Sequence, residues 1–168
     1  SGQLAGHGYA DELLERCFMD TRAQGRQGMA ILASDKKRGF LADPRFLEHK
    51  GFTVADQAGY FRLYWKPIDE MVQPPRFLDC AKSLRTDREG LVLYYTHQCP
   101  FTAKYAPVAQ AAAERHGVPF QAVRLESGEQ ARENPSPFTA YSLFWQGEFV
   151  THEIQSEKKI EKLLEALS

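Results

Sequence analysis

The 168-residue sequence has little cysteine: only Cys17, Cys80 and Cys99 occur. Their number is odd, and no two of them stand at Cys-x-x-Cys spacing. This pattern argues against a disulfide framework and favours a reducing, cytoplasmic setting. Scattered histidines such as His97 and His152 have no spacing typical of a metal site, so we predict no bound metal.

The sequence also lacks an excess of charge of either sign and any long apolar run. Its 21 basic and 22 acidic residues give a net charge of −1, which gives no sign of nucleic-acid binding. No apolar stretch approaches the ~20 residues of a membrane-spanning helix, and no signal peptide opens the chain. We therefore expect neither nucleic acid nor membrane as a partner.

The sequence does have enough apolar residues for a core, since 43% of its residues are hydrophobic. It also has a break in the periodic pattern that divides the chain in two. Pro74 and Pro75 interrupt the periodic pattern inside KPIDEMVQPPRF, because they lack amide donors and force extended backbone before them. The following RFLDCAKSLRTDREG is typical of a short helix. We predict domains at residues 1–67 and 90–168, joined by a linker helix over residues 68–89.

The first part of the chain alternates helical and strand patterns. The apolar stripe of Leu13, Leu14, Cys17 and Phe18 predicts an amphipathic helix over residues 10–25, with Cys17 in the core. In ADPRFLEHKGF, an aspartate followed by a proline is a helix start and the glycine is its stop. GMAILAS, FTVAD and YFRLYWKP are predicted strands.

The second part gives the order strand, helix, strand, helix, strand, strand, helix. The segments are residues 91–96, 102–116, 120–125 and 129–133, a hairpin turning at Gln146-Gly147, and a last helix over 157–167. This is the order that a thioredoxin-type domain requires.

Glycines stand directly ahead of the first predicted helix, in GQLAGHGYADELL. Glycine lets the backbone approach a ligand closely, and the free amides of a helix start suit a phosphate group. A plain loop before a helix is the alternative that the spacing alone leaves open.

The pattern Gln3-x-x-Gly6-x-Gly8, then an amphipathic helix, a short strand and a capped helix ending in HKGF, resembles the second half of a GNAT-superfamily N-acetyltransferase. The resemblance covers residues 3–67 and implies that the glycine turn binds the pyrophosphate of acetyl-CoA. The implied cofactor-binding residues are Gln3, Leu4, Ala5, Gly6, His7, Gly8 and Tyr9.

The sequence departs from this family at its catalytic positions. The usual tyrosine acid, which protonates the departing thiolate, is replaced by Leu47, and the usual asparagine by Phe40. Tyr60 is our tentative substitute and Tyr64 the second choice, with a structural role as the alternative for each. The family's oxyanion donor precedes the glycine turn. We therefore expect this chain to be a fragment, or its sheet to be completed by another copy, since unpaired strand edges seek partners.

Cys99 follows an apolar run and precedes a helix in LVLYYTHQCPFTAKY. A thiolate is favoured at a helix N-terminus, so Cys99 is a tentative catalytic thiol, with an inert buried thiol as the alternative. The Cys-Pro-Phe-Thr turn resembles the active site of glutaredoxins and thioredoxins. Thr102 stands where dithiol members have a second cysteine, so only monothiol chemistry is expected. Pro137 is the candidate for the cis-proline of that fold.

Four longer stretches together resemble the YoaP family, which joins an acetyltransferase domain to a C-terminal YoaP-like domain: GLVLYYTHQCPFTAKY, NPSPFTAYSLFWQGEFVTHEI, FLADPRFLEHKGF and RFLDCAKSL. The resemblance implies a bacterial or archaeal cytoplasmic protein. Its activity would be N-acetyl transfer from acetyl-CoA to an unnamed small-molecule amine or thiol-bearing substrate, expected of the full-length form.

We therefore predict a mixed α/β (α+β) chain. Residues 1–67 are assigned to the C-terminal half of a GNAT-like fold, 68–89 to the linker and 90–168 to a thioredoxin-like domain. Two alternatives stand beside acetyl transfer: a monothiol redox or partner-binding module without transferase activity, and an interaction protein in which both sites are incidental. A homo-oligomer is compatible with each.

Overall fold

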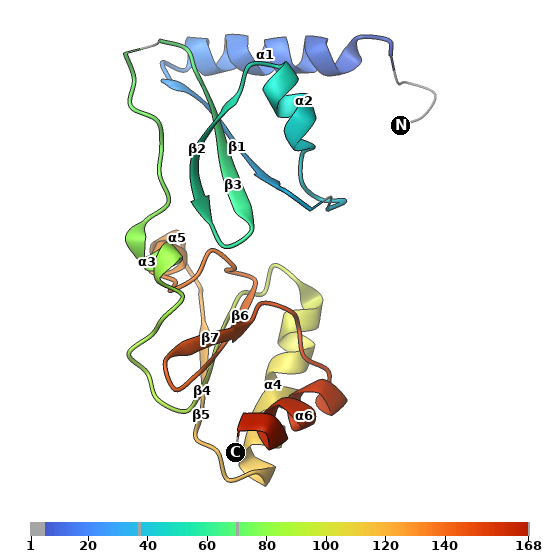
Figure 1. Ribbon diagram of the computed structural model, residues 1–168, viewed down its shortest axis with the longest axis vertical. Helices are drawn as coiled ribbons and strands as arrows, with labels where there is room; N and C mark the ends of the chain where they lie inside the picture. The colour runs from blue at the N-terminus through green and yellow to red at the C-terminus, as the bar shows by residue number, and fades with distance from the viewer. Residues whose placement is uncertain (1–5, 37, 70, 168) are drawn as a thin grey trace. The chain divides into compact units, whose positions relative to one another are not determined.

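The computed structural model describes residues 6–36, 38–69 and 71–167. This part of the chain has six α-helices and seven strands in two sheets, which confirms the predicted mixed α/β class (Figure 1). The chain divides into two compact units, Ser1–Phe77 and Leu78–Ser168. The division falls inside residues 68–89, whose role as a linker stays a prediction.

Unit 1 is a three-stranded antiparallel sheet with helices α1 and α2. Its elements are α1 (Tyr9–Ala23), β1 (Gly28–Ser34), α2 (Pro44–His49), β2 (Thr53–Ala58) and β3 (Phe61–Pro67). The strand order is β1-β3-β2. The predicted start of α2 is confirmed: the Asp43 side chain accepts a hydrogen bond from the Arg45 amide at 2.9 Å, with Pro44 in the first turn.

The core of unit 1 is small. Ala33, Leu47, Phe52 and Tyr64 are buried, and Leu14 and Phe18 of α1 pack against them. The prediction that Cys17 lies in the core is wrong, because Cys17 is exposed, and Leu13 of the same stripe is 64% exposed. Only one edge of the stripe meets the sheet.

Unit 2 is a four-stranded sheet of order β5-β4-β6-β7, in which β4 and β5 are parallel and the other pairs antiparallel. Its elements are α3 (Asp79–Ser83), β4 (Leu91–Tyr95), α4 (Pro100–Arg115), β5 (Phe120–Arg124), α5 (Gly128–Arg132), β6 (Tyr141–Trp145), β7 (Glu148–Thr151) and α6 (Glu157–Leu167). From β4 onward this is the predicted order of elements.

Side chains of β4 and β6 are buried on both faces of this sheet. Leu91, Leu93 and Leu143 pack with α4 and α6, whose buried residues include Ile160 and Leu164. The opposite face holds a second cluster, formed by Val92, Tyr94, Leu125 and Phe144. Two-sided burial explains why β4 is a continuous apolar run, and why β6 is apolar at every position except the buried Ser142.

Two turn predictions in unit 2 have different outcomes. The hairpin turns at Gln146 (φ 49°) and Gly147 (φ 84°) as predicted, and positive φ at both positions is the requirement of a type I′ turn. The prediction of a cis peptide before Pro137 is wrong, because the described residues contain no cis peptide bond. In this stretch the buried Asn134 side chain donates a hydrogen bond to the Ser136 carbonyl oxygen at 2.7 Å.

Among the described residues, no helix combines the length and the apolar character needed to span a bilayer. The same residues contain no group of three or more His, Cys, Asp and Glu side chains arranged to hold a metal ion.

Candidate functional site

The glycine turn before α1 is open to solvent. Gly6 and Gly8 have φ of +80° and +78°, and a Cβ built at either meets no atom within 4 Å. Gly8 is the N-cap of α1, and His7 and Tyr9 beside it are exposed. Gln3, Leu4 and Ala5, which the sequence also assigns to cofactor binding, lie outside the described residues. Among the described residues, the turn thus faces open space and not packed protein.

Two carboxylates stand in the first turn of α1, where they would oppose an anion. Asp11 forms an ion pair with Lys50 beyond the end of α2, and Glu12 pairs with Arg16 at 2.7 Å. Each negative charge therefore has a cation beside it, which offsets its effect on the helix start.

The two candidate tyrosines occupy different environments. The Tyr60 ring lies 3.6 Å beneath the Arg38 guanidinium and against Phe61. Tyr64 is fully buried, and its hydroxyl donates to Glu48 Oε1 at 2.8 Å. Burial, reinforced by Glu48, raises the pKa of Tyr64 above its usual value, which keeps the phenol protonated.

Tyr64 and Glu48 also line a cavity of about 460 Å³ between the end of β1, the β1–α2 loop and β3. Ser34 lies in its wall, and the buried Ser34 hydroxyl has no hydrogen-bond partner among the described residues. Leu47, at the position of the family's usual tyrosine, is packed in the core and offers no proton. Leu47 therefore cannot act as the proton donor of this unit.

Cys99 lies where the sequence predicts it, at a helix start. It is the N-cap of α4, it is partly exposed, and Pro100 follows in the first turn. The Thr102 hydroxyl is fully buried and reaches the carbonyl oxygens of Thr96 and Cys99, the latter at 2.7 Å. These hydrogen bonds of Thr102 stabilise the turn that contains Cys99.

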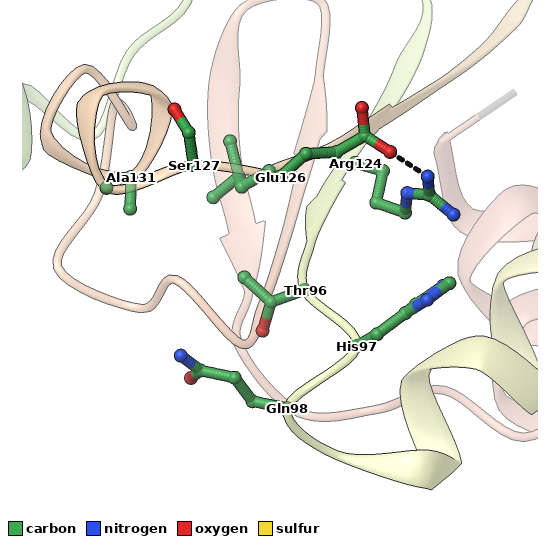
Figure 2. Close-up of a pocket in the computed structure, with 9 residues that line it drawn as sticks. Thr96, His97, Gln98, Arg124, Glu126, Ser127 and Ala131 are labelled. Carbon is green, nitrogen blue, oxygen red and sulfur yellow. Dashed lines mark ion pairs between the residues drawn. The ribbon is translucent and has the colours of Figure 1, made fainter.

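An open cavity of about 570 Å³ lies beside this turn, at the carboxyl ends of the parallel strands β4 and β5. Figure 2 shows the β4–α4 turn on one wall and the β5–α5 loop on the other. The lining residues are Thr96, His97, Gln98, Arg124, Leu125, Glu126, Ser127, Gly128 and Ala131. Arg124 and Glu126 form an ion pair with each other on the β5 side of the cavity.

Sequence analysis did not identify Thr96, Arg124 or Glu126. Crevices at the carboxyl ends of parallel strands are the usual ligand sites of open α/β sheets. The predicted strand–helix–strand order of elements was the one signal in the sequence for such a crevice. Which side chains meet there depends on the pairing of β4 with β5, and these strands are separated by the whole of α4.

Comparison with known proteins gives one family and one curated relative. A YoaP-like family model matches residues 119–162. The whole chain is 39% identical, over 169 aligned residues, to a Bacillus subtilis (strain 168) protein named "Uncharacterized N-acetyltransferase YoaP", and covers 67% of that protein's length. No solved structure matches the chain.

Proposed function

Because the chain belongs to the YoaP family, we propose that it is part of an N-acetyltransferase that uses acetyl-CoA, with a thioredoxin-like accessory unit at its C-terminal side. The open glycine turn at the start of α1 carries this proposal. Its positive-φ glycines leave room for a pyrophosphate at a helix N-terminus, where backbone amides and the helix dipole favour negative charge. The acceptor is an amine that neither the sequence nor the relative's name identifies.

The rest of unit 1 is consistent with the second half of a GNAT-like fold. After α1 come β1, α2 and the β2–β3 pair, in the order that the resemblance implies. We propose that further strands of this sheet belong to the third of the relative that this chain does not cover, or that a second copy supplies the pairing. Transfer itself is thus proposed for the complete protein.

The proposed reaction needs proton transfer at two points. The amine loses a proton as its nitrogen attacks the thioester carbonyl, and the departing CoA thiolate gains one. Tyr60 stays our prediction for the acid. Tyr64 is the alternative, because its protonated phenol and its partner Glu48 line a cavity.

We expect the chain to bind CoA through the glycine turn. Replacing Gly8 by valine fills the space of the pyrophosphate, so isothermal titration with CoA should show at least about a tenfold loss of affinity. Gly25→Val is the matched control: Gly25 also has positive φ, +64°, and open space, but at the other end of α1. Equal affinities for the two variants, or no heat from the unchanged chain, would contradict the proposal.

A second function, monothiol redox or partner binding, is favoured by the position of Cys99. Cys99 is partly exposed at the N-cap of the 16-residue helix α4, so its sulfur, the nucleophile in disulfide exchange, is accessible to a partner. Glutathione disulfide supplies the oxidant: the Cys99 sulfur attacks one sulfur, the disulfide breaks, and a glutathione thiolate leaves.

Competitive alkylation tests this second function. Cys17 is the more exposed thiol, but it lies in the body of α1 and not at a helix start. With limiting iodoacetamide, peptide mass spectrometry should find Cys99 modified before Cys17, because reactivity follows thiolate character. Cys17 reacting first would leave Cys99 as an inert residue and favour a plain interaction protein, in which Cys99→Ser changes no binding.

A further inference from the structure

The cavity of about 460 Å³ in unit 1 is lined mainly by charged side chains. Its volume lies within the range of small-molecule sites. Three carboxylates and three guanidiniums line it, from the end of β1, the β1–α2 loop, α2 and β3: Asp35, Asp43, Glu48, Arg38, Arg45 and Arg62. Which of these charges already have partners within the protein decides the kind of ligand that the cavity suits.

Each of the three carboxylates accepts a hydrogen bond from the protein itself. Asp35 forms an ion pair with Arg62, whose Nη2 donates to Asp35 Oδ2 at 2.8 Å. Asp43 caps α2 by accepting from a backbone amide at 2.9 Å, and Glu48 accepts from the buried tyrosine hydroxyl of β3 at 2.8 Å. Arg62 therefore has its counter-ion in the cavity wall, and the other two carboxylates have hydrogen-bond donors.

The other two guanidiniums form no ion pair with any described residue. Arg45 is exposed in the first turn of α2. Arg38 is half-buried, and its guanidinium carbon lies 3.6 Å from the centroid of the Tyr60 ring. Stacking on a ring fixes the plane of a guanidinium without using the N–H donors at its edge. Both side chains thus bring a positive charge without a counter-ion to the same cavity.

Two such guanidiniums favour an anionic ligand. Two like charges on one cavity wall repel each other, and an anion placed beside both offsets that repulsion. The planar fork of N–H donors in arginine matches the oxygens of a carboxylate or a phosphate, and these charge-assisted hydrogen bonds are among the stronger ones in proteins. An oxyanion therefore fits the unpaired groups of this cavity better than a cation or a neutral ligand does.

We propose that this cavity binds an oxyanion, a carboxylate or a phosphate, through Arg38 and Arg45. In the complete protein this oxyanion belongs to the acetyl acceptor, which is then an amine that carries a negatively charged group. Tyr64, the alternative acid for the transfer, lines the same cavity. The assignment to the acceptor rests on the proposed acetyl transfer, whereas the anion site itself does not.

Titrations of the full chain with small anions test the site without acetyl-CoA. At constant ionic strength, amide NMR should give a Kd of about 5 mM or tighter for inorganic phosphate or for acetate. The anion that binds more tightly identifies the kind of oxyanion, and neutral acetamide should not bind at that concentration. No binding of either anion, or equal binding of acetamide, overturns the proposal.

Arginine variants assign the contacts. Arg38→Gln and Arg45→Gln should each weaken binding of the anion at least about fivefold, because each removes charge-assisted hydrogen bonds. Arg26→Gln is the matched control: Arg26 is an exposed arginine of unit 1 between α1 and β1, and it does not line the cavity. An equal loss in the Arg26 variant would mean general attraction to positive charge and would contradict a specific site.

The glycine turn is the other place in unit 1 where phosphate could bind, and Gly8→Val separates the two. This variant fills the turn and leaves the cavity unchanged, because Gly8 is not among the residues that line the cavity. Its affinity for phosphate should stay within about twofold of that of the unchanged chain. Loss of phosphate binding in Gly8→Val would place the anion at the turn and overturn the cavity site.

The assignment to the acceptor has its own test in the complete protein. With acetyl-CoA, release of free CoA should have a kcat/KM at least about tenfold higher for β-alanine or O-phosphoethanolamine than for propylamine, which lacks the oxyanion. Arg45→Gln should remove this preference. Equal values for propylamine, or no transfer to either oxyanion-bearing amine, would overturn the assignment. Binding of CoA by the same protein would show that such a failure does not extend to the proposed cofactor site.

Discussion

Replacing Leu143 by alanine is expected to lower the free energy of unfolding of unit 2 by about 2–5 kcal/mol. Leu143 is fully buried at the centre of β6, opposite Leu93 of β4, and it belongs to the cluster that α4 and α6 cover. The strands on both sides fix the backbone, so the cavity left by the missing carbons cannot collapse. Urea unfolding followed through Trp145 fluorescence, in a Trp65→Phe background, measures the change.

The same substitution at an exposed leucine of this unit is the control. Leu78 is 53% exposed, so Leu78→Ala should change the free energy of unfolding by no more than about 0.5 kcal/mol. A loss of similar size in both variants would mean that β6 does not lie at the centre of a packed core.

Replacing Gly90 by alanine is expected to lower the free energy of unfolding by about 2–4 kcal/mol, because backbone strain and a steric overlap act together. Gly90 has φ +78°, and a Cβ there would lie 2.6 Å from the carbonyl oxygen of Pro119. That oxygen accepts the Leu91 amide at 2.9 Å, at the start of the parallel pairing of β4 with β5. The substitution therefore weakens the sheet where its two parallel strands begin.

Gly117→Ala separates the two causes. Gly117 also has positive φ, +66°, but a Cβ there meets no atom within 4 Å. In this variant only the backbone strain should lower the free energy of unfolding, by about 1–2 kcal/mol. Thermal or urea unfolding of both variants gives the comparison, and equal losses would show that the Pro119 contact does not matter.

Local features of the fold were predictable because neighbouring residues determine them. The cap at Asp43, the turn at Gln146-Gly147 and the helix start at Cys99 depend on a few adjacent residues each. The stripe of α1 shows the limit of this reasoning. Its periodicity predicts an apolar face, but a three-stranded sheet covers only part of that face, so Cys17 stays exposed.

The candidate sites also divide into those formed by neighbouring residues and those formed by tertiary packing. The glycine turn and the thiol are local motifs, so the sequence alone could propose both as candidates. The Tyr64–Glu48 hydrogen bond joins β3 to α2 across 16 positions, and no pattern within either element predicts it. The sequence therefore gave no reason to prefer Tyr64 over Tyr60 as the acid.

By itself, the sequence determined the mixed α/β class, the order of the elements in the second unit, the start of α4 at Cys99 and the family. Only the tertiary structure decided which side chains share a cavity, which tyrosine is buried beside a carboxylate and which half of an apolar stripe meets a core. The physical reason is range: caps and turns form between residues a few positions apart, whereas cavities and burial arise where β4 and β5, or α2 and β3, are brought together by pairing and packing.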